Sequence, residues 1–220
     1  MGASSSSSSG GASKIDKPIS RAYSGTGSDA AGRVGQSQQL MPDTKVAIAP
    51  IMCEVIPGLW LGSRAAATQL GLLKSLGIAA CINCTEESNL HPQHLAYHQI
   101  SVSDSANVDI LQYVNHAVVE WISRQHGGVL IYCHQGVSRS VTVTLAVLLH
   151  LRPAWSLLNC WHHLKHVRPS ARPNPGFLQG LVDYERKLRN ESTVRVSNKK
   201  RALIARADAP TKRLDSSRVV

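Results

Sequence analysis

The chain has 220 residues, of which 43% are hydrophobic and 17% charged, and its 24 Lys and Arg outnumber its 14 Asp and Glu to give a formal net charge of +10. This composition is typical of one globular domain with appendages. The longest uncharged apolar-rich run, residues 140–151, is shorter than the roughly 18 to 20 residues of a membrane-spanning helix, which excludes a transmembrane protein. The N-terminus has no apolar stretch and the five cysteines are irregularly spaced, so we expect cytosolic thiols and no secreted disulfide framework.

Composition divides the chain into three parts. Residues 1–45 are rich in Ser and Gly, and because such a segment buries too little apolar surface to offset its ordering entropy, we expect a disordered leader. Apolar residues become periodic over residues 46–189, the predicted folded domain. Residues 190–220 hold 8 basic and 3 acidic residues, half of the net charge, and are predicted to form a disordered basic tail. The charge therefore indicates a solvated tail, and no nucleic-acid partner is expected.

Within the middle part, short apolar runs alternate with helical patterns. The predicted strands are residues 56–61, 78–84, 100–102 and 129–132. The predicted helices are residues 63–76, 108–125, 140–151, 156–167 and 175–188. Strands that alternate with helices and then give way to a helical C-terminal half predict an α/β fold, with a central mixed, largely parallel sheet flanked by helices.

The segment that carries chemistry follows the last predicted strand. Residues 133–140 read Cys-His-Gln-Gly-Val-Ser-Arg-Ser and lead directly into a helix. A glycine-containing loop between a buried strand and a helix N-terminus binds phosphate, because unpaired backbone N–H groups and the positive end of the helix dipole converge there. The predicted phosphate-binding residues are His134, Gln135, Gly136, Val137, Ser138 and Arg139.

Side chains at the two ends of this loop suit phosphoryl transfer. Cys133, at the mouth of a loop with fixed positive dipoles, is expected to be a thiolate and therefore a nucleophile. The planar guanidinium of Arg139 can hold two oxygens of a phosphoryl group. Gly136 permits the tight turn that points successive N–H groups inward, and the Ser140 hydroxyl can hydrogen-bond the sulfur and help it leave.

The loop resembles the signature of the Cys-based protein tyrosine phosphatase superfamily, H-C-x-x-G-x-S-R-S, which is present here as Y-C-H-Q-G-V-S-R-S. Four other blocks resemble those of the atypical dual-specificity phosphatases in the same order: IPGLWLGS, LGIAACINCTEE, SVSDS and RPNPGFLQGLVDYE. The resemblance covers residues 56–188. It implies a protein phosphatase of that fold, which hydrolyses phosphotyrosine and phosphoserine or phosphothreonine in phosphoproteins through a phosphocysteine intermediate, with no cofactor or metal.

The resemblance also implies a general acid upstream of the nucleophile, because an unprotonated alkoxide or phenolate leaves slowly. Asp104, in a polar loop after the predicted strand at residues 100–102, is our choice, although a helix-capping role also fits it. Asp109 is the competitor, but it lies in the first turn of the next predicted helix, where the helix dipole accounts for an acidic residue.

Two features leave other functions open. Tyr132 stands where the family usually has the histidine that organises the loop, which leaves room for a catalytically weak protein that only binds phosphate groups. The basic tail is the one feature that favours another substrate, such as an RNA 5′ end or a phosphoinositide. His134, Gln135 and Val137 stand where phosphoinositide phosphatases usually place lysines, which disfavours a lipid. The sequence also shows none of the tyrosine-bearing recognition loop that deepens the pocket of tyrosine-specific relatives.

Two further signals concern regulation. In some family members a cysteine at the end of the strand that includes Cys84 traps the oxidised nucleophile as a disulfide, so Cys84 is a candidate redox partner, or else a buried strand residue. Met1-Gly2-Ala-Ser-Ser-Ser fits the pattern for N-myristoylation of Gly2, and a flexible leader is the alternative. A single myristoyl chain binds membranes only marginally. We expect a cytoplasmic protein, associated with membranes if Gly2 is acylated, and the nucleus and the oligomeric state stay open.

Overall fold

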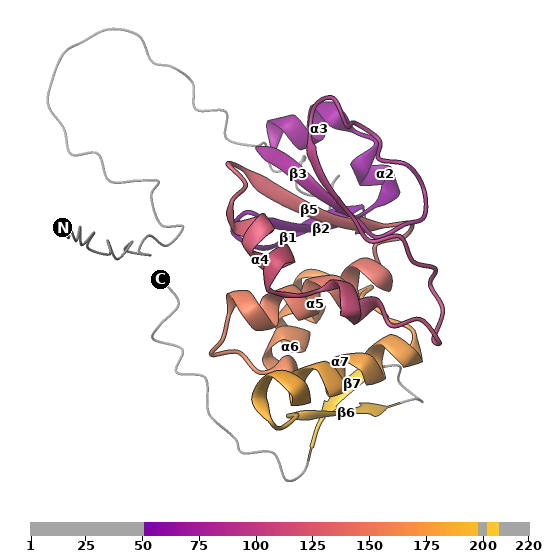
Figure 1. Ribbon diagram of the computed structural model, residues 1–220, viewed down its shortest axis with the longest axis vertical. Coiled ribbons are helices and arrows are strands. Elements are labelled where there is room, and N and C mark those ends of the chain that lie inside the picture. Colours follow the sequence, from indigo (N-terminus) through magenta and orange to yellow (C-terminus); the bar gives the residue numbers. More distant parts are fainter. Residues whose placement is uncertain (1–50, 198–201, 207–220) are drawn as a thin grey trace, which may run out of the picture. The chain divides into compact units, whose positions relative to one another are not determined.

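A five-stranded β-sheet forms the centre of the fold (Figure 1). The computed structural model describes residues 51–197 and 202–206. The strand order is β1-β2-β5-β3-β4, in which β1 is antiparallel to β2 and all other neighbours are parallel. The strands are β1 (Met52–Ile56), β2 (Leu59–Ser63), β3 (Ile78–Asn83), β4 (Ala96–Gln99) and β5 (Gly128–Cys133). This sheet confirms the predicted mixed, largely parallel arrangement.

The central strand β5 pairs with β2 on one side and with β3 on the other. Every residue of β5 after Gly128 is buried. A strand covered on both faces needs no alternation of polar and apolar residues, which explains why a continuous apolar run predicted it. Because β2, β5 and β3 are parallel, their carboxyl ends meet at one edge of the sheet, where Cys133 ends β5.

Helices cover both faces of the sheet. Figure 1 shows α2 and α3 on one side, and α4, α5, α6 and α7 on the other. Helix α5 lies against the sheet and is buried from Arg139 to Leu149, as expected for a helix that is apolar nearly all round. The bounds are Arg64–Ala67 for α2, Leu70–Ser75 for α3, Ile110–Tyr113 for the 3₁₀ helix η1, His116–Ser123 for α4, Arg139–Leu151 for α5, Leu157–Val167 for α6 and Pro175–Arg189 for α7.

Two of the predicted helices are interrupted. The helix expected over residues 63–76 is divided into α2 and α3, and at the break the hydroxyl of Thr68 donates to the carbonyl of Ala65 at 2.8 Å, a local bond that competes with helix continuation. The helix expected over residues 108–125 is divided into η1 and α4. Asn115 caps the start of α4, so a second N-cap inside the predicted run begins a new helix.

The strand predicted at residues 100–102 is corrected to β4, which ends just before it. Ile100 and Val102 are buried but belong to no strand, so their apolar character reflects burial and not pairing. Strand β4 is at the edge of the sheet and keeps polar, partly exposed side chains such as His98 and Gln99. An edge strand of this kind produces no apolar run for sequence analysis to detect.

The tail predicted to be disordered from residue 190 begins with ordered structure, which corrects the domain boundary at residue 189. Strands β6 (Val194–Ser197) and β7 (Ala202–Ala205) pair antiparallel. Val194 and Leu203 are buried in the main core cluster. The sequence pattern did not predict these two short strands, because they hold few aliphatic residues and basic residues surround them. The remainder of the tail, residues 207–220, and the predicted leader, with Gly2, lie outside the described residues.

The buried carboxylate of Glu185 in α7 joins this hairpin to the domain. It accepts hydrogen bonds from the N–H of Leu157 at 2.6 Å, the N–H of Thr193 at 2.8 Å and the hydroxyl of Ser192 at 2.9 Å. One side chain therefore holds the start of α6 and the chain just before β6. In the described part of the chain, no helix is both long enough and apolar enough to cross a membrane.

Candidate active site

The loop between β5 and α5 turns sharply at Gly136. This residue has a φ of 68°, and a Cβ atom added to it would lie 2.6 Å from the carbonyl carbon of Gly62 in β2. Any other residue would strain the backbone and collide with the neighbouring strand. The fold thus requires glycine here for two independent reasons, and the tight turn expected from the sequence is present.

Two backbone carbonyls of the loop bond to segments outside it. The carbonyl of His134 accepts from the N–H of Arg64 at 3.1 Å, and that of Val137 accepts from the N–H of Arg172 at 2.7 Å. These two bonds fix the loop to the start of α2 and to the segment before α7. The N-terminus of α5 adds the positive end of its dipole at the same place. This is the geometry of a phosphate cradle.

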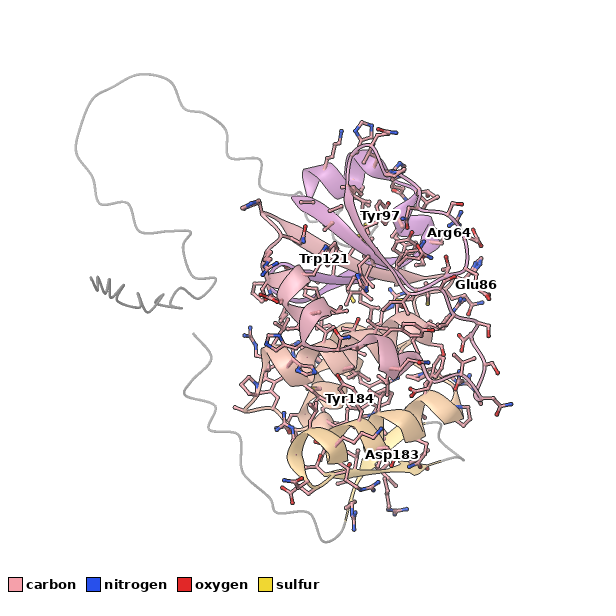
Figure 2. All side chains as sticks on the ribbon, in the orientation of Figure 1. Arg64, Glu86, Tyr97, Trp121, Asp183 and Tyr184 are labelled. Carbon is pink, nitrogen blue, oxygen red and sulfur yellow. The ribbon has the colours of Figure 1, made fainter. Side chains whose placement is uncertain are left out.

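A carboxylate that sequence analysis did not single out braces the loop. The two oxygens of Glu87 lie 2.6 Å from Nη2 of Arg64 and 2.6 Å from Nε2 of His134. Glu87 comes from the connection between β3 and β4, and Arg64, labelled in Figure 2, begins α2. Glu87 therefore joins His134, the first residue of the phosphate-binding loop, to the β3–β4 connection and to α2. No local pattern predicts it, because the three residues are far apart in the sequence.

Cys133 and Ser140, whose side chains were predicted to hydrogen-bond each other, are in contact. The sulfur of Cys133 is 3.1 Å from the hydroxyl oxygen of Ser140, which lies in the first turn of α5. Cys133 is only 2% exposed and Ser140 is fully buried, so the contact between them is shielded from solvent. A serine hydroxyl at this distance can donate a hydrogen bond to a thiolate.

The guanidinium of Arg139 is oriented by the backbone. Its Nη1 donates to the carbonyl of Val102 at 3.0 Å. Its Nε–H is buried, makes no hydrogen bond and lies 3.9 Å from a carboxylate oxygen of Asp104. A buried, unsatisfied donor is costly in a folded protein, and an oxygen of a bound phosphoryl group would satisfy this one.

Asp104 lies beside the loop, whereas Asp109 does not. Oδ1 of Asp104 accepts hydrogen bonds from the hydroxyl of Ser138 and from Nδ2 of Asn174, both at 2.8 Å, and Oδ2 is the oxygen that faces Arg139. Asp109 instead accepts from the N–H of Leu111 and caps η1. The structure thus gives a capping role to Asp109 and places Asp104 beside Ser138 and Arg139 of the loop.

Cys84 is fully buried directly after β3. Its N–H donates to the carbonyl of Tyr132 at 2.8 Å, which places it beside the end of β5 and so near Cys133. Burial raises the pKa of the Cys84 thiol well above its ordinary value, the proximity of Cys133 raises it further, and Arg139 opposes both effects. All five cysteines are free thiols.

Tyr132 points away from α5 and packs in the second core cluster, between the sheet and α2 and α3. Its hydroxyl is buried and makes no hydrogen bond. Burial raises the pKa of this phenol, with smaller effects from Tyr97 and Cys81. The residue that stands in place of the family's histidine is therefore a neutral side chain packed among apolar residues, on the opposite side of β5 from Cys133.

Two further observations concern a surface groove and the grouping of metal-binding side chains. A groove of about 580 Å³ lies between α7 and residues 106–112, but Cys133 and Arg139 are not among its lining residues. Among residues 51–197 and 202–206, no group of three or more His, Cys, Asp and Glu side chains is arranged to hold a metal ion.

Asn174 is a second residue, after Glu87, that sequence analysis did not single out. It is the N-cap of α7, where its Oδ1 accepts from the N–H of Phe177 at 2.9 Å, and its Nδ2 donates to Asp104. An asparagine followed by proline at the first helical position is a recognisable helix start. The cap could thus have been found, but a contact with a residue 70 positions earlier depends on the tertiary fold.

A loop that begins with a cysteine and ends with an arginine at a helix N-terminus, with a carboxylic acid beside it, defines a cysteine-dependent phosphatase. A family model, "Dual specificity phosphatase, catalytic domain", matches residues 59–187. The chain belongs to this family and is a dual-specificity protein phosphatase. This confirms the family and the enzyme class expected from the sequence, and it does not favour a weak phosphate-binding protein or a non-protein substrate.

Named relatives agree with this assignment. Human "Dual specificity protein phosphatase 14" is 33% identical over 148 residues, which are 66% of this chain and 74% of the relative. "Dual specificity protein phosphatase 1" of Arabidopsis thaliana is 35% identical over 136 residues, 60% of this chain and 67% of the relative. The crystal structure of human DUSP28 has a TM-score of 0.59 and 32% sequence identity, and the match covers 63% of this chain and 95% of that one.

Proposed function

We propose that the phosphatase reaction of this protein is divided among Cys133, Arg139, Asp104 and Ser140. The observation that carries the proposal is their convergence on one loop. The sulfur of Cys133 is 3.1 Å from Ser140 Oγ, and Oδ2 of Asp104 is 3.9 Å from Arg139 Nε. Through these two contacts the nucleophile, the phosphate ligand and the acid all lie around the N-terminus of α5.

In the first step the thiolate of Cys133 attacks phosphorus in line with the leaving oxygen. The backbone amides of the loop and the Nε–H of Arg139 donate to the phosphoryl oxygens and stabilise the charge that develops on them. Oδ1 of Asp104 already accepts two hydrogen bonds, so Oδ2 carries the proton that is given to the leaving serine, threonine or tyrosine oxygen. The products are a phosphocysteine and the free hydroxyl of the substrate.

In the second step a water molecule attacks the phosphocysteine. Oδ2 of Asp104, now deprotonated, takes a proton from this water and acts as the general base. The sulfur leaves as a thiolate, and the hydroxyl of Ser140 donates a hydrogen bond to it as its charge returns. Inorganic phosphate is released and the enzyme regains its starting protonation state.

Replacement of the nucleophile tests this assignment. Cys133→Ser keeps the loop amides and Arg139, so we expect it to lose all measurable hydrolysis of p-nitrophenyl phosphate while it still binds a phosphopeptide by calorimetry. Wild type and Cys133→Ser are compared on phosphotyrosine and phosphothreonine peptides as well. Residual activity above about a tenth of wild type would refute the role of Cys133, since loss of a covalent nucleophile costs several orders of magnitude.

We also propose that Gly2 is N-myristoylated and that the protein is cytoplasmic with a weak affinity for membranes. The support is the sequence Met1-Gly2-Ala-Ser-Ser-Ser, and a single acyl chain gives only marginal, reversible binding. Metabolic labelling with an alkyne analogue of myristate, compared between wild type and Gly2→Ala in cells, is the test. Equal labelling of the two proteins would contradict the proposal.

Finally, we propose that Cys84 protects Cys133 from irreversible oxidation. Peroxide converts the Cys133 thiolate to a sulfenic acid, and the thiol of Cys84 then displaces water from it to form a disulfide. The hydrogen bond from Cys84 N–H to the carbonyl of Tyr132, the residue before Cys133, supports this pairing. Peptide mapping after mild peroxide treatment tests it, and a bridge from Cys133 to any other cysteine would contradict it.

A further inference from the structure

We infer that the first turn of α7, through Asn174 and Gly176, is a positioning element that holds the general acid Asp104 against the phosphate-binding loop. This inference rests on the proposed role of Asp104. Two independent observations carry it, namely a set of three hydrogen bonds and a close backbone contact.

The hydrogen bonds form a closed set between three segments of the chain. Nδ2 of Asn174 donates to Oδ1 of Asp104 at 2.8 Å, and the hydroxyl of Ser138 donates to the same oxygen at 2.8 Å. The Ser138 oxygen in turn accepts from the backbone N–H of Asn174 at 3.1 Å. The acid, the phosphate-binding loop and the start of α7 are therefore fixed relative to one another.

These bonds leave one carboxylate oxygen for chemistry. Because Oδ1 is engaged by two donors, the side chain of Asp104 cannot rotate freely although it is 35% exposed. Oδ2 is held on the side of Arg139, 3.9 Å from its Nε. Asn174 does not itself approach the sulfur of Cys133 in any described contact, so its effect on the reaction passes through Asp104.

The second observation is the close backbone contact at Gly176, the residue that follows Pro175. A Cβ atom at Gly176 would lie 2.0 Å from the carbonyl oxygen and 2.6 Å from the carbonyl carbon of Ala106. Both are backbone atoms of the loop that carries Asp104, so the loop would have to move. The φ of Gly176 is not in the left-handed region, and its requirement for glycine is therefore steric. The absence of a side chain lets α7 approach the acid loop closely enough for the Asn174 bond.

Another glycine of α7 offers a matched control. A Cβ atom at Gly180, one turn later, would lie 3.2 Å from a side-chain methyl of Leu111 and more than 4 Å from any backbone atom outside its own helix. A flexible leucine side chain can move by a few tenths of an ångström. Gly180→Ala thus makes the same change in helix propensity as Gly176→Ala without displacing the acid loop.

For Asn174 the discriminating variant is Asn174→Ser. Serine is as good an N-cap as asparagine, and the backbone N–H that donates to Ser138 is kept. The variant therefore keeps the start of α7 but loses the donor to Asp104, because its side chain is too short to replace Nδ2. A purely structural role of Asn174 predicts normal catalysis by Asn174→Ser.

The experiment measures kcat/KM, which reports the steps up to the departure of the leaving group, for phenyl phosphate, whose leaving group is a strong base, and for p-nitrophenyl phosphate, whose leaving group needs little protonation. We expect Asn174→Ser and Gly176→Ala to lose about tenfold in kcat/KM on phenyl phosphate, since a misplacement of about 1 Å can cost up to 10²-fold. On p-nitrophenyl phosphate we expect less than about a twofold change. Inhibition by vanadate and the melting temperature of Asn174→Ser should match wild type, and Gly180→Ala should match wild type in its activity on both substrates and in inhibition by vanadate.

A double mutant separates this inference from the proposed function. If Asn174 acts through Asp104, then adding Asn174→Ser to Asp104→Ala causes no further loss on phenyl phosphate. Additive losses, or equal losses on both substrates in Asn174→Ser and Gly176→Ala, would overturn the inference. If Asp104→Ala alone shows no dependence on the leaving group, the acid assignment itself fails, and that outcome is recognised before either α7 variant is considered.

Discussion

Replacement of Glu185 by alanine is predicted to destabilise the domain strongly without changing its chemistry. The buried carboxylate accepts from the N–H groups of Leu157 and Thr193 at 2.6 and 2.8 Å, and from the hydroxyl of Ser192 at 2.9 Å. The hydroxyl has a second acceptor in the carbonyl of Val194 at 3.4 Å, but the two N–H groups have none in the described contacts. Each unsatisfied buried donor costs about 1 to 3 kcal/mol, so the expected loss is about 4 kcal/mol.

Chemical denaturation measures this loss. Unfolding by urea, followed by circular dichroism at 25 °C, gives the free energy of unfolding for wild type, Glu185→Ala and the control Glu191→Ala. Glu191 is exposed, and its replacement should change the free energy by no more than about 0.5 kcal/mol. At low temperature, where both proteins are folded, kcat of Glu185→Ala should equal that of wild type. A loss below 1 kcal/mol in Glu185→Ala would refute the reasoning that this carboxylate fastens the hairpin and α6 to α7.

Three further predictions concern the site. Asp104→Ala should lower kcat on phenyl phosphate by roughly 10²-fold or more, whereas Asp109→Ala should leave kcat unchanged, and the reverse result would mean that the acid is Asp109. Tyr132→Phe removes a buried hydroxyl that has no partner, so urea denaturation should show a gain of about 1 kcal/mol in stability, and a loss would reveal a partner for the hydroxyl. Because the pKa of the Cys84 thiol is raised by burial, little of it is thiolate at pH 7, and the bridge to oxidised Cys133 should form faster at pH 9 than at pH 7. A rate independent of pH, followed by mass spectrometry of alkylated protein, would count against attack by Cys84.

The elements that the sequence predicted correctly are those with strong apolar signals. Strand β5 and helix α5 are buried on nearly all sides, so their residues are apolar whatever their neighbours are, and the loop between them contains a recognisable motif. The edge strand β4 and the hairpin of β6 and β7 were missed or displaced because their stability comes from partners elsewhere in the chain. The same reason explains the interrupted helices, where local caps decide the boundaries.

The residues of the candidate site likewise fall into those that a local sequence pattern predicts and those that depend on tertiary contacts. Cys133, Arg139 and Ser140 are local to the motif, and Asp104 follows from its place in the chain relative to that motif. Glu87, which pairs with His134, and Asn174, which pairs with Asp104, are separated from their partners by tens of residues. Their roles depend on how the carboxyl edge of the sheet meets the start of α7, and a sequence pattern does not specify that contact.

The most direct test of the central claim is to trap the phosphocysteine. Asp104→Ala should still attack p-nitrophenyl phosphate, whose leaving group needs little protonation, but it lacks the base for the second step, so the intermediate should accumulate. The reaction is quenched in acid and the peptides are mapped by mass spectrometry. The account predicts one added phosphoryl group on the peptide that contains Cys133 and none in the Asp104→Ala/Cys133→Ser double variant. A phosphoryl group on another residue, or release of p-nitrophenol by the double variant at the rate of Asp104→Ala, would contradict it.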